Sequence, residues 1–180
     1  MNHIEENTIQ ETTRDARIVV GNITFFWISF FIIFLDQLTK YLVRANISYG
    51  DIIKLTPKFF WLTHVRNTGA AFSFSFGSAE LNRIIFLIVS SLASLLLVYL
   101  ILSSRNKVDT IAYSLILGGA VGNLIDRIIY GYVTDFIWTD FPDFIMNRWP
   151  VFNIADSSIV VAICLLIIFS VFSNKAKESA

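Results

Sequence analysis

The chain has 180 residues, 55% of them hydrophobic, and its 14 acidic and 14 basic side chains leave no net charge at pH 7. A soluble domain averages about 45–50% apolar residues, and the excess here lies in long runs, which indicates an integral membrane protein. The neutral balance gives no electrostatic argument for a nucleic-acid partner, and a single cysteine excludes an internal disulfide.

Motifs for metal or nucleotide binding are missing from the sequence. His3 and His64 lie far apart, and Cys164 stands alone in an apolar run, where a small buried hydrophobe is expected. No glycine motif for phosphate or dinucleotide binding occurs. We therefore expect neither a metal nor a cofactor.

The first predicted element is a polar segment, residues 1–17, which lacks the basic start and cleavage site of a secretory signal. We expect it to remain as a cytoplasmic tail. A first membrane span follows at about residues 18–43, because an apolar run of this length can cross a bilayer. Asp36 and Lys40 lie four residues apart near its end, a spacing that suits an ion pair. An ordinary interfacial helix end with a snorkelling lysine is the alternative.

The segment between the first and second spans is too polar to cross a membrane. Short strands are predicted at residues 52–55 and 59–65. Residues 72–76 alternate strictly between phenylalanine and serine, which is also the period of a strand. Asn67 and Gly69 have turn chemistry, and a plain turn is the competing interpretation of Asn67. We expect a small extracytoplasmic β-ribbon or cradle whose phenyl rings lie in the membrane interface.

The second and third spans are predicted at about residues 82–103 and 110–130. The third contains the stretch GGAVGNLIDR at residues 118–127. Its glycines remove side-chain bulk, so that a neighbouring helix can approach closely. Ionisable groups at membrane depth are costly and therefore indicate a functional site. The polar members of this stretch are Asn123, Asp126 and Arg127.

A polar and aromatic segment, residues 130–150, contains Asp135 and precedes the fourth span at about residues 151–173. Asn153 and Asp156 lie within the first turns of that span. The remaining residues, 174–180, form a second cytoplasmic tail. We thus predict an all-α integral membrane protein with four transmembrane helices and one membrane-embedded domain, residues 18–173.

The distribution of basic residues predicts the orientation of the chain. Four spans place both termini on one side, and the short flanks and loop on that side carry six lysines and arginines. The positive-inside rule makes this side cytoplasmic, although the opposite side also carries basic residues. All the polar groups of the spans then lie at one level, near the extracytoplasmic face, and the inner halves are almost free of charge.

Several carboxylates at one depth are what an aspartyl hydrolase needs. Two close carboxylates share one proton, so that one acts as general base and the other as general acid. Asp156 has no cation near it in sequence and Asp135 has only apolar or neutral neighbours, whereas Asp126 adjoins Arg127. This favours Asp135 and Asp156 as the catalytic dyad, with Asp126 and Arg127 as supporting residues. In the alternative assignment, Asp36 or Asp126 takes the place of Asp135 in the dyad.

The asparagines have two interpretations of equal weight. Asn67, Asn123 and Asn153 either clamp the dyad or the substrate backbone, or they serve as helix caps and interhelix hydrogen bonds. Three other functions compete with the aspartyl hydrolase. A proton-coupled carrier requires polar groups through the whole membrane and internal repeats. A serine–lysine peptidase would use Lys40, and a scaffold would have no catalytic group.

The chain also resembles the lipoprotein signal peptidase family, the bacterial signal peptidase II. Five blocks carry the resemblance, in the order of the family and across most of residues 18–172. They are LDQLTK at 35–40, RNTGAAF at 66–72, GGAVGNLIDR at 118–127, GYVTDF at 131–136 and FNIADS at 152–157.

The resemblance implies a metal-free, cofactor-free aspartyl endopeptidase of the bacterial cytoplasmic membrane with Asp135 and Asp156 as catalytic residues. Its substrates would be prolipoproteins, cut before a diacylglyceryl-modified cysteine, and its inhibitors globomycin-like cyclic peptides. We further expect contact with membrane lipids, no nucleic acid, and a monomer. The positions that match residues lining or bracing the family's pocket are Asp36, Lys40, Asn67, Asn123, Arg127 and Asn153. We expect Gly69 and Asp126 to be further substrate-binding or supporting residues.

Overall fold

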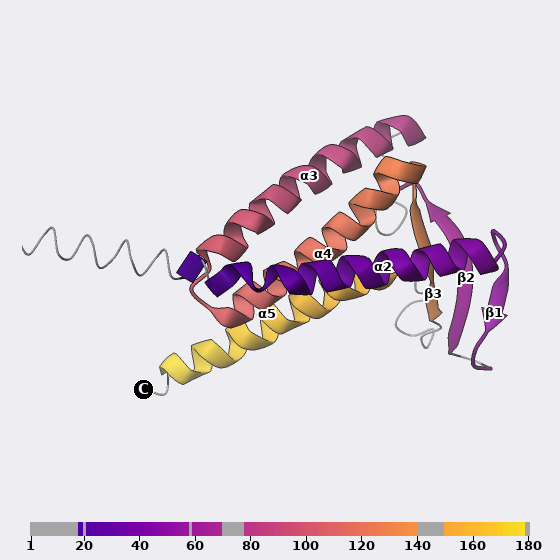
Figure 1. Cartoon of the computed structure of the whole chain (residues 1–180). Coiled ribbons are helices and arrows are strands. Elements are labelled where there is room, and N and C mark those ends of the chain that lie inside the picture. The colour runs from indigo at the N-terminus through magenta and orange to yellow at the C-terminus, as the bar shows by residue number, and fades with distance from the viewer. Residues whose placement is uncertain (1–17, 20, 58, 70–77, 140–149, 179–180) are drawn as a thin grey trace, which may run out of the picture.

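The computed structural model describes residues 18–19, 21–57, 59–69, 78–139 and 150–178 (Figure 1). Within these ranges the chain forms four long helices and a small three-stranded sheet. The helices are α2 (Phe26–Asn46), α3 (Ala79–Ser103), α4 (Lys107–Tyr130) and α5 (Ile154–Glu178), and the strands are β1 (Ile52–Lys54), β2 (Phe60–Asn67) and β3 (Val133–Thr139). Each helix is long and apolar enough to cross a membrane. The predicted fold class is confirmed.

Helix α4 is the centre of the bundle and packs against α2, α3 and α5. Figure 1 shows the sheet across one end of the bundle, beside the end of α2 and the end of α4. The outward faces of the helices carry large exposed side chains such as Phe30, Leu92 and Phe172. These apolar faces are suited to contact with lipid. Cys164 also lies on an exposed face, of α5, and the expectation of a buried cysteine is wrong.

The glycines of α4 bring its neighbours close, as the sequence predicts. A Cβ atom on Gly118 would lie 2.7 Å from Cβ of Ile32 on α2, and one on Gly122 would lie 2.7 Å from Oδ2 of Asp36. A Cβ atom on Gly119 would collide with the backbone carbonyl oxygen of Ala155 on α5. The absence of these side chains lets the polar end of α4 touch both neighbouring helices.

The sheet is antiparallel in the order β1-β2-β3. Strands β1 and β2 correspond to the two predicted strands, whereas β3 lies in a segment for which the sequence predicted no strand. Residues along β3 are nearly all buried, on both faces, so the alternation that marks a half-exposed strand is missing from it. Val65 of β2 pairs with Asp135 of β3, next to an irregularity between Leu62 and Val65. The predicted strand at residues 72–76 lies outside the described residues.

Two helices begin later than predicted. The first apolar run is interrupted by a turn at Thr24 and Phe25, where the hydroxyl of Thr24 donates to the carbonyl oxygen of Gly21 at 2.7 Å, and α2 starts after it. Helix α5 starts at Ile154 because the side-chain oxygen of Asn153 accepts the backbone N–H of Asp156 at 2.9 Å and caps the first turn.

Candidate active site

Asp135 and Asp156 come together because strand β3 lies against the chain that leads into α5. The backbone N–H of Ile137 donates to the carbonyl oxygen of Phe152 at 2.8 Å, and the N–H of Phe152 donates back at 3.0 Å. This bridge places the middle of β3 beside the first turn of α5. Asp135 is buried, with 2% of its surface exposed, and Asp156 is half-buried.

Asn153 connects the two carboxylates. Its Nδ2 donates to Oδ1 of Asp135 at 2.7 Å, and its backbone N–H donates to Oδ2 of Asp156 at 3.2 Å. The N-cap bond from Asp156 to Oδ1 of Asn153 completes a reciprocal pair, in the manner of a capping box. Capping and contact with the dyad were alternatives for Asn153 at the level of sequence, and the structure shows both.

Two further asparagines supply the remaining donors. Nδ2 of Asn67, at the end of β2, donates to Oδ2 of Asp135 at 3.0 Å. Nδ2 of Asn123, on α4, donates to Oδ1 of Asp156 at 2.8 Å. Each of the four carboxylate oxygens of Asp135 and Asp156 therefore accepts an N–H, and none of these donors carries a charge.

The orientation of each asparagine amide is fixed by a hydrogen-bond donor that contacts its side-chain oxygen. The N–H of Gly69 donates to Oδ1 of Asn67 at 3.0 Å, and the ammonium of Lys40 donates to Oδ1 of Asn123 at 2.8 Å. The N-cap bond does the same for Asn153. Because neither an ammonium nor a backbone N–H can accept a hydrogen bond, each amide nitrogen must turn to the carboxylates.

Burial raises the pKa of Asp135 to about 7. The neighbouring carboxylate of Asp156 acts in the same direction, since two adjacent negative charges repel each other. Hydrogen bonds from Asn67 and Asn153 favour the ionised form and partly oppose this rise. Near neutral pH the site can thus hold one proton between two carboxylates, which is the requirement for paired acid and base catalysis.

A second, charged cluster lies directly behind the amides. The ammonium of Lys40 lies 2.8 Å from Asp36 and 3.5 Å from Asp126, and all three side chains are fully buried. Asp36 also accepts the backbone N–H of Ala155 at 3.0 Å, and Asp126 accepts that of Thr134 at 2.8 Å. The cluster thereby joins α2, α4, α5 and β3 around the dyad.

Comparison with known proteins shows the family of the chain. The sequence model of the family described as signal peptidase (SPase) II matches residues 28–172. The chain belongs to the signal peptidase II family. A lipoprotein signal peptidase of Serratia marcescens is 43% identical over 148 residues, which make up 81% of this chain and 83% of that one. The resemblance carried by the five sequence blocks is confirmed.

Other relatives extend the match. A lipoprotein signal peptidase of Enterococcus faecalis is 38% identical over 158 residues, 87% of this chain and 92% of its own. A solved structure described as a bacterial membrane enzyme, obtained by the in meso method at 2.3 Å resolution, superposes with a TM-score of 0.76. It is 34% identical and covers 86% of this chain and 91% of its own. Membership in signal peptidase II makes the chain a multi-pass membrane protease that removes signal peptides from lipoproteins.

The ion pairs of Asp126 in this signal peptidase II come from helix α2. In the described part of the chain Asp126 pairs with Lys40 and with Arg44, at 3.3 Å, instead of with its sequence neighbour Arg127. The guanidinium of Arg127 lies over the ring of Phe86 and donates to the carbonyl oxygen of Gly69 at 3.4 Å. Arg127 therefore steadies the turn that orients Asn67.

Arg44 is a structural partner of the charged cluster that sequence reasoning missed, and it contacts neither carboxylate of the dyad among the described residues. Besides Asp126 it contacts the hydroxyl of Thr134 at 2.9 Å and lies over the ring of Tyr130. The spacing of Asp36, Lys40 and Arg44 is the signal that was available, because positions i, i+4 and i+8 share one helix face.

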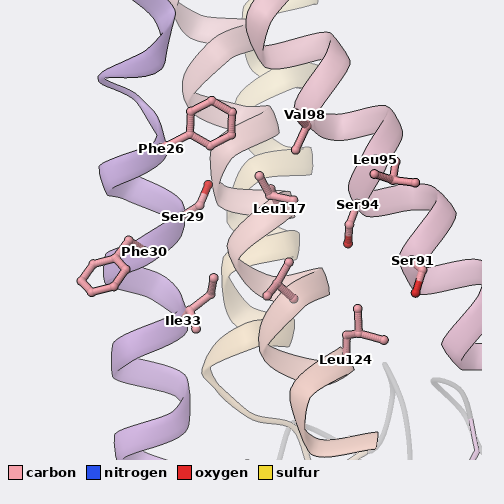
Figure 2. Close-up of a pocket in the computed structure, with 11 residues that line it drawn as sticks. Phe26, Ser29, Phe30, Ile33, Ser91, Ser94, Leu95, Val98, Leu117 and Leu124 are labelled. Atoms are coloured by element: carbon pink, nitrogen blue, oxygen red, sulfur yellow. The ribbon is translucent and has the colours of Figure 1, made fainter. Parts of the chain in front are cut away.

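An apolar cavity of about 520 Å³ lies between α2, α3 and α4 (Figure 2). Its lining is hydrocarbon apart from three serines, and the dyad is not part of it. Leu117, Val121 and Leu124 of α4 form its floor, and Leu124 is one turn before Arg127. In Figure 1 α3 diverges from α2 towards the end of the bundle that carries the sheet.

Proposed function

We propose that this signal peptidase II is an aspartyl endopeptidase that cuts prolipoproteins immediately before the diacylglyceryl-modified cysteine. The observation that carries the proposal is the juxtaposition of Asp135 and Asp156, bridged by Asn153, with neutral amide donors as their direct hydrogen-bond partners among the described residues. Arg127 and Lys40 act on the pair only through their charge, and neutral direct donors allow the two carboxylates to share a proton.

The raised pKa of Asp135 supports a proton on this carboxyl at the start of the proposed reaction. In that reaction Asp156 takes a proton from a water molecule as the water oxygen attacks the carbonyl carbon of the scissile bond. Protonated Asp135 gives its proton to the carbonyl oxygen, which yields a neutral tetrahedral diol. As the diol collapses, Asp156 gives its proton to the leaving nitrogen, Asp135 takes the proton of one diol hydroxyl, and the C–N bond breaks, so the dyad is left with one proton as at the start.

The supporting residues hold this geometry. We propose that Asn67, Asn123 and Asn153 fix the rotamers of the two carboxylates, and that Gly69 and Arg127 fix Asn67. The charged cluster of Asp36, Lys40 and Asp126 braces the elements that carry them. Preorganised donors of this kind contribute to catalysis because they need not reorient during the reaction.

The apolar cavity suits the signal peptide of such a substrate. A signal peptide contains about 7–15 consecutive apolar residues. We propose that this segment lies between α2 and α3, over the floor formed by α4, and that the peptide continues past Leu124 to the dyad. The active site would then lie near the extracytoplasmic face, with both termini of the chain cytoplasmic. We further propose that the enzyme is a monomer in contact with membrane lipids and that globomycin-like cyclic peptides inhibit it.

Cleavage by the purified protein tests the proposal. Protein in detergent is mixed with a diacylglyceryl-modified prolipoprotein and with the unmodified precursor, and the products are identified by mass spectrometry. We expect only the modified substrate to be cut, before the lipidated cysteine, with inhibition by globomycin and none by a chelator.

Variants of the dyad distinguish the competing mechanisms. Asp135→Asn and Asp156→Asn are each expected to lower kcat by about 10²-fold to 10⁴-fold, since each removes a proton-transferring group. The control Asp51→Asn changes an exposed carboxylate and should leave kcat unchanged. Appreciable cleavage by either dyad variant would instead favour a serine–lysine mechanism.

A further inference from the structure

Lys40 is a fully buried lysine whose direct partners are Asp36, Asn123 and Asp126; its charge acts on Asp135 of the dyad only from a distance. Its ammonium lies 2.8 Å from Oδ2 of Asp36, 2.8 Å from Oδ1 of Asn123 and 3.5 Å from Oδ2 of Asp126. An ammonium has three N–H groups and no acceptor. These three oxygens, from α2 and α4, can therefore use all three N–H groups of Lys40.

The contact with Asn123 fixes the direction of its amide. With Oδ1 on the ammonium, Nδ2 of Asn123 faces Oδ1 of Asp156 at 2.8 Å. A rotated amide would set its NH₂ against the ammonium of Lys40 and its oxygen against the carboxylate of Asp156. Both contacts of the rotated form are repulsive, so the charge on Lys40 selects a single orientation.

The other two partners of Lys40 depend on it less. Asp126 keeps Arg44 at 3.3 Å and the N–H of Thr134 at 2.8 Å, and Asp36 keeps Gln37 at 3.1 Å and the N–H of Ala155 at 3.0 Å. Without Lys40, the amide of Asn153, at 3.2 Å, would be the one donor left to Oδ1 of Asn123 among the described residues. Removal of the ammonium therefore frees Asn123 more than it frees the two aspartates.

We propose that Lys40 is a positioning residue for hydrolysis, which acts on Asp156 through Asn123 by holding the amide of Asn123 in its donating orientation. The inference rests on the proposed aspartyl mechanism. It assigns to Lys40 an effect on turnover that is separate from its part in holding the helices together.

A double-mutant cycle tests the inference, with kcat and KM measured on the lipidated prolipoprotein. Lys40→Met keeps an unbranched side chain and removes the charge. We expect it to lower kcat by about tenfold to a hundredfold, the size expected for one lost charge-assisted hydrogen bond, and to change KM by less than about threefold. In the background of Asn123→Ala the same change should lower kcat by less than about threefold, because its target is gone.

Arg44→Met is the matched control, because Arg44 also pairs with Asp126 and does not contact Asn123 in the described part of the chain. It should lower the melting temperature and leave kcat within about threefold of wild type. If Lys40→Met folds poorly, Asp36→Asn/Lys40→Met removes one charge of each sign and keeps the buried cluster balanced.

The outcomes separate the two proposals. If the wild-type protein cuts the substrate but the effects of Lys40→Met and Asn123→Ala multiply, or if Arg44→Met lowers kcat as much as Lys40→Met does, the inference about Lys40 is overturned. Loss of folded protein in both Lys40 variants would assign Lys40 to folding alone and would also overturn it. If the wild-type protein and its dyad variants cut equally, the aspartyl mechanism itself fails.

Discussion

Asn153 contacts Asp135 through its amide nitrogen, at 2.7 Å, while its amide oxygen caps the helix that carries the second carboxylate. One side chain thus has a structural and a positioning function, and substitution can separate them. Asn153→Ser retains a good N-cap but cannot reach Asp135 with an amide. We expect it to lower kcat at least about tenfold with little change in melting temperature.

Asn153→Ala is the comparison for that prediction. It removes the cap as well, and loss of an N-cap costs about 1 kcal/mol of stability. The alanine variant should therefore melt at a lower temperature than the serine variant, while both lose turnover to a similar extent. Full activity of Asn153→Ser would contradict a positioning function for the amide.

The pH dependence of cleavage follows from the raised pKa of Asp135, about 7. Asp135 is the general acid of the proposed mechanism and must be protonated, so kcat/KM should fall as the pH rises through about 7. The pH dependence of kcat/KM reports on the free enzyme, and a rate measured at low substrate concentration from pH 5 to 9 checks it. A profile that stays level to pH 9 would contradict the assigned roles.

The same pKa predicts the pH dependence of stability. Asp135 has a pKa near 3.8 as a free group and about 7 when folded, so the folded chain binds the extra proton between these values. The free energy of unfolding therefore decreases as the pH rises from about 4 to about 7. Asp135→Asn removes this penalty, and its melting temperature relative to wild type should increase over that range and then remain level.

The glycines of α4 predict a contrast in packing. Gly119→Ala would drive a methyl group into the carbonyl of Ala155, a rigid backbone group, and overpacking of this kind costs about 1–3 kcal/mol. Gly21 has no atom within 4 Å of an added Cβ, so Gly21→Ala is the control. Thermal unfolding in detergent should show a lower melting temperature for the first variant only.

The cavity between α2 and α3 predicts an effect on substrate binding. Ser94→Trp would fill the space that we assign to the signal peptide, and it should raise KM with little effect on kcat. Leu92→Trp places the same ring on the exposed face of α3, outside the cavity lining, and is the control. Equal KM values for the two variants would contradict the proposal that the signal peptide binds in this cavity.

Much of the architecture could be predicted from local patterns. The four spans are visible as apolar runs, and β1 and β2 are visible as short runs between turn residues. Strand β3 was missed because both of its faces are buried, so that Val133, Phe136 and Asp135 follow no alternation. The later starts of α2 and α5 depend on individual side-chain bonds of Thr24 and Asn153, which a hydropathy window does not detect.

The sequence predicted which residues belong to the candidate site better than it predicted which of them contact one another. Depth along the spans indicated that the polar residues would meet, because all of them lie near one end of the bundle. Depth does not indicate which side chains touch, and proximity in sequence was misleading for Asp126, which pairs with Arg44 across helices. The donors that orient Asn67 and Asn123 come from a turn and from another helix, and both arise only from tertiary packing.

The bridge between β3 and the start of α5 also bears on biogenesis. Asp135 lies in β3, which follows α4, and Asp156 lies in α5, so a nascent chain that has inserted only α2, α3 and α4 has neither carboxylate of the proposed proton pair in place. In the proposed mechanism, proteolytic activity should therefore appear only once α5 packs beside β3. Until then, the newly made chain should not cleave the membrane proteins around it.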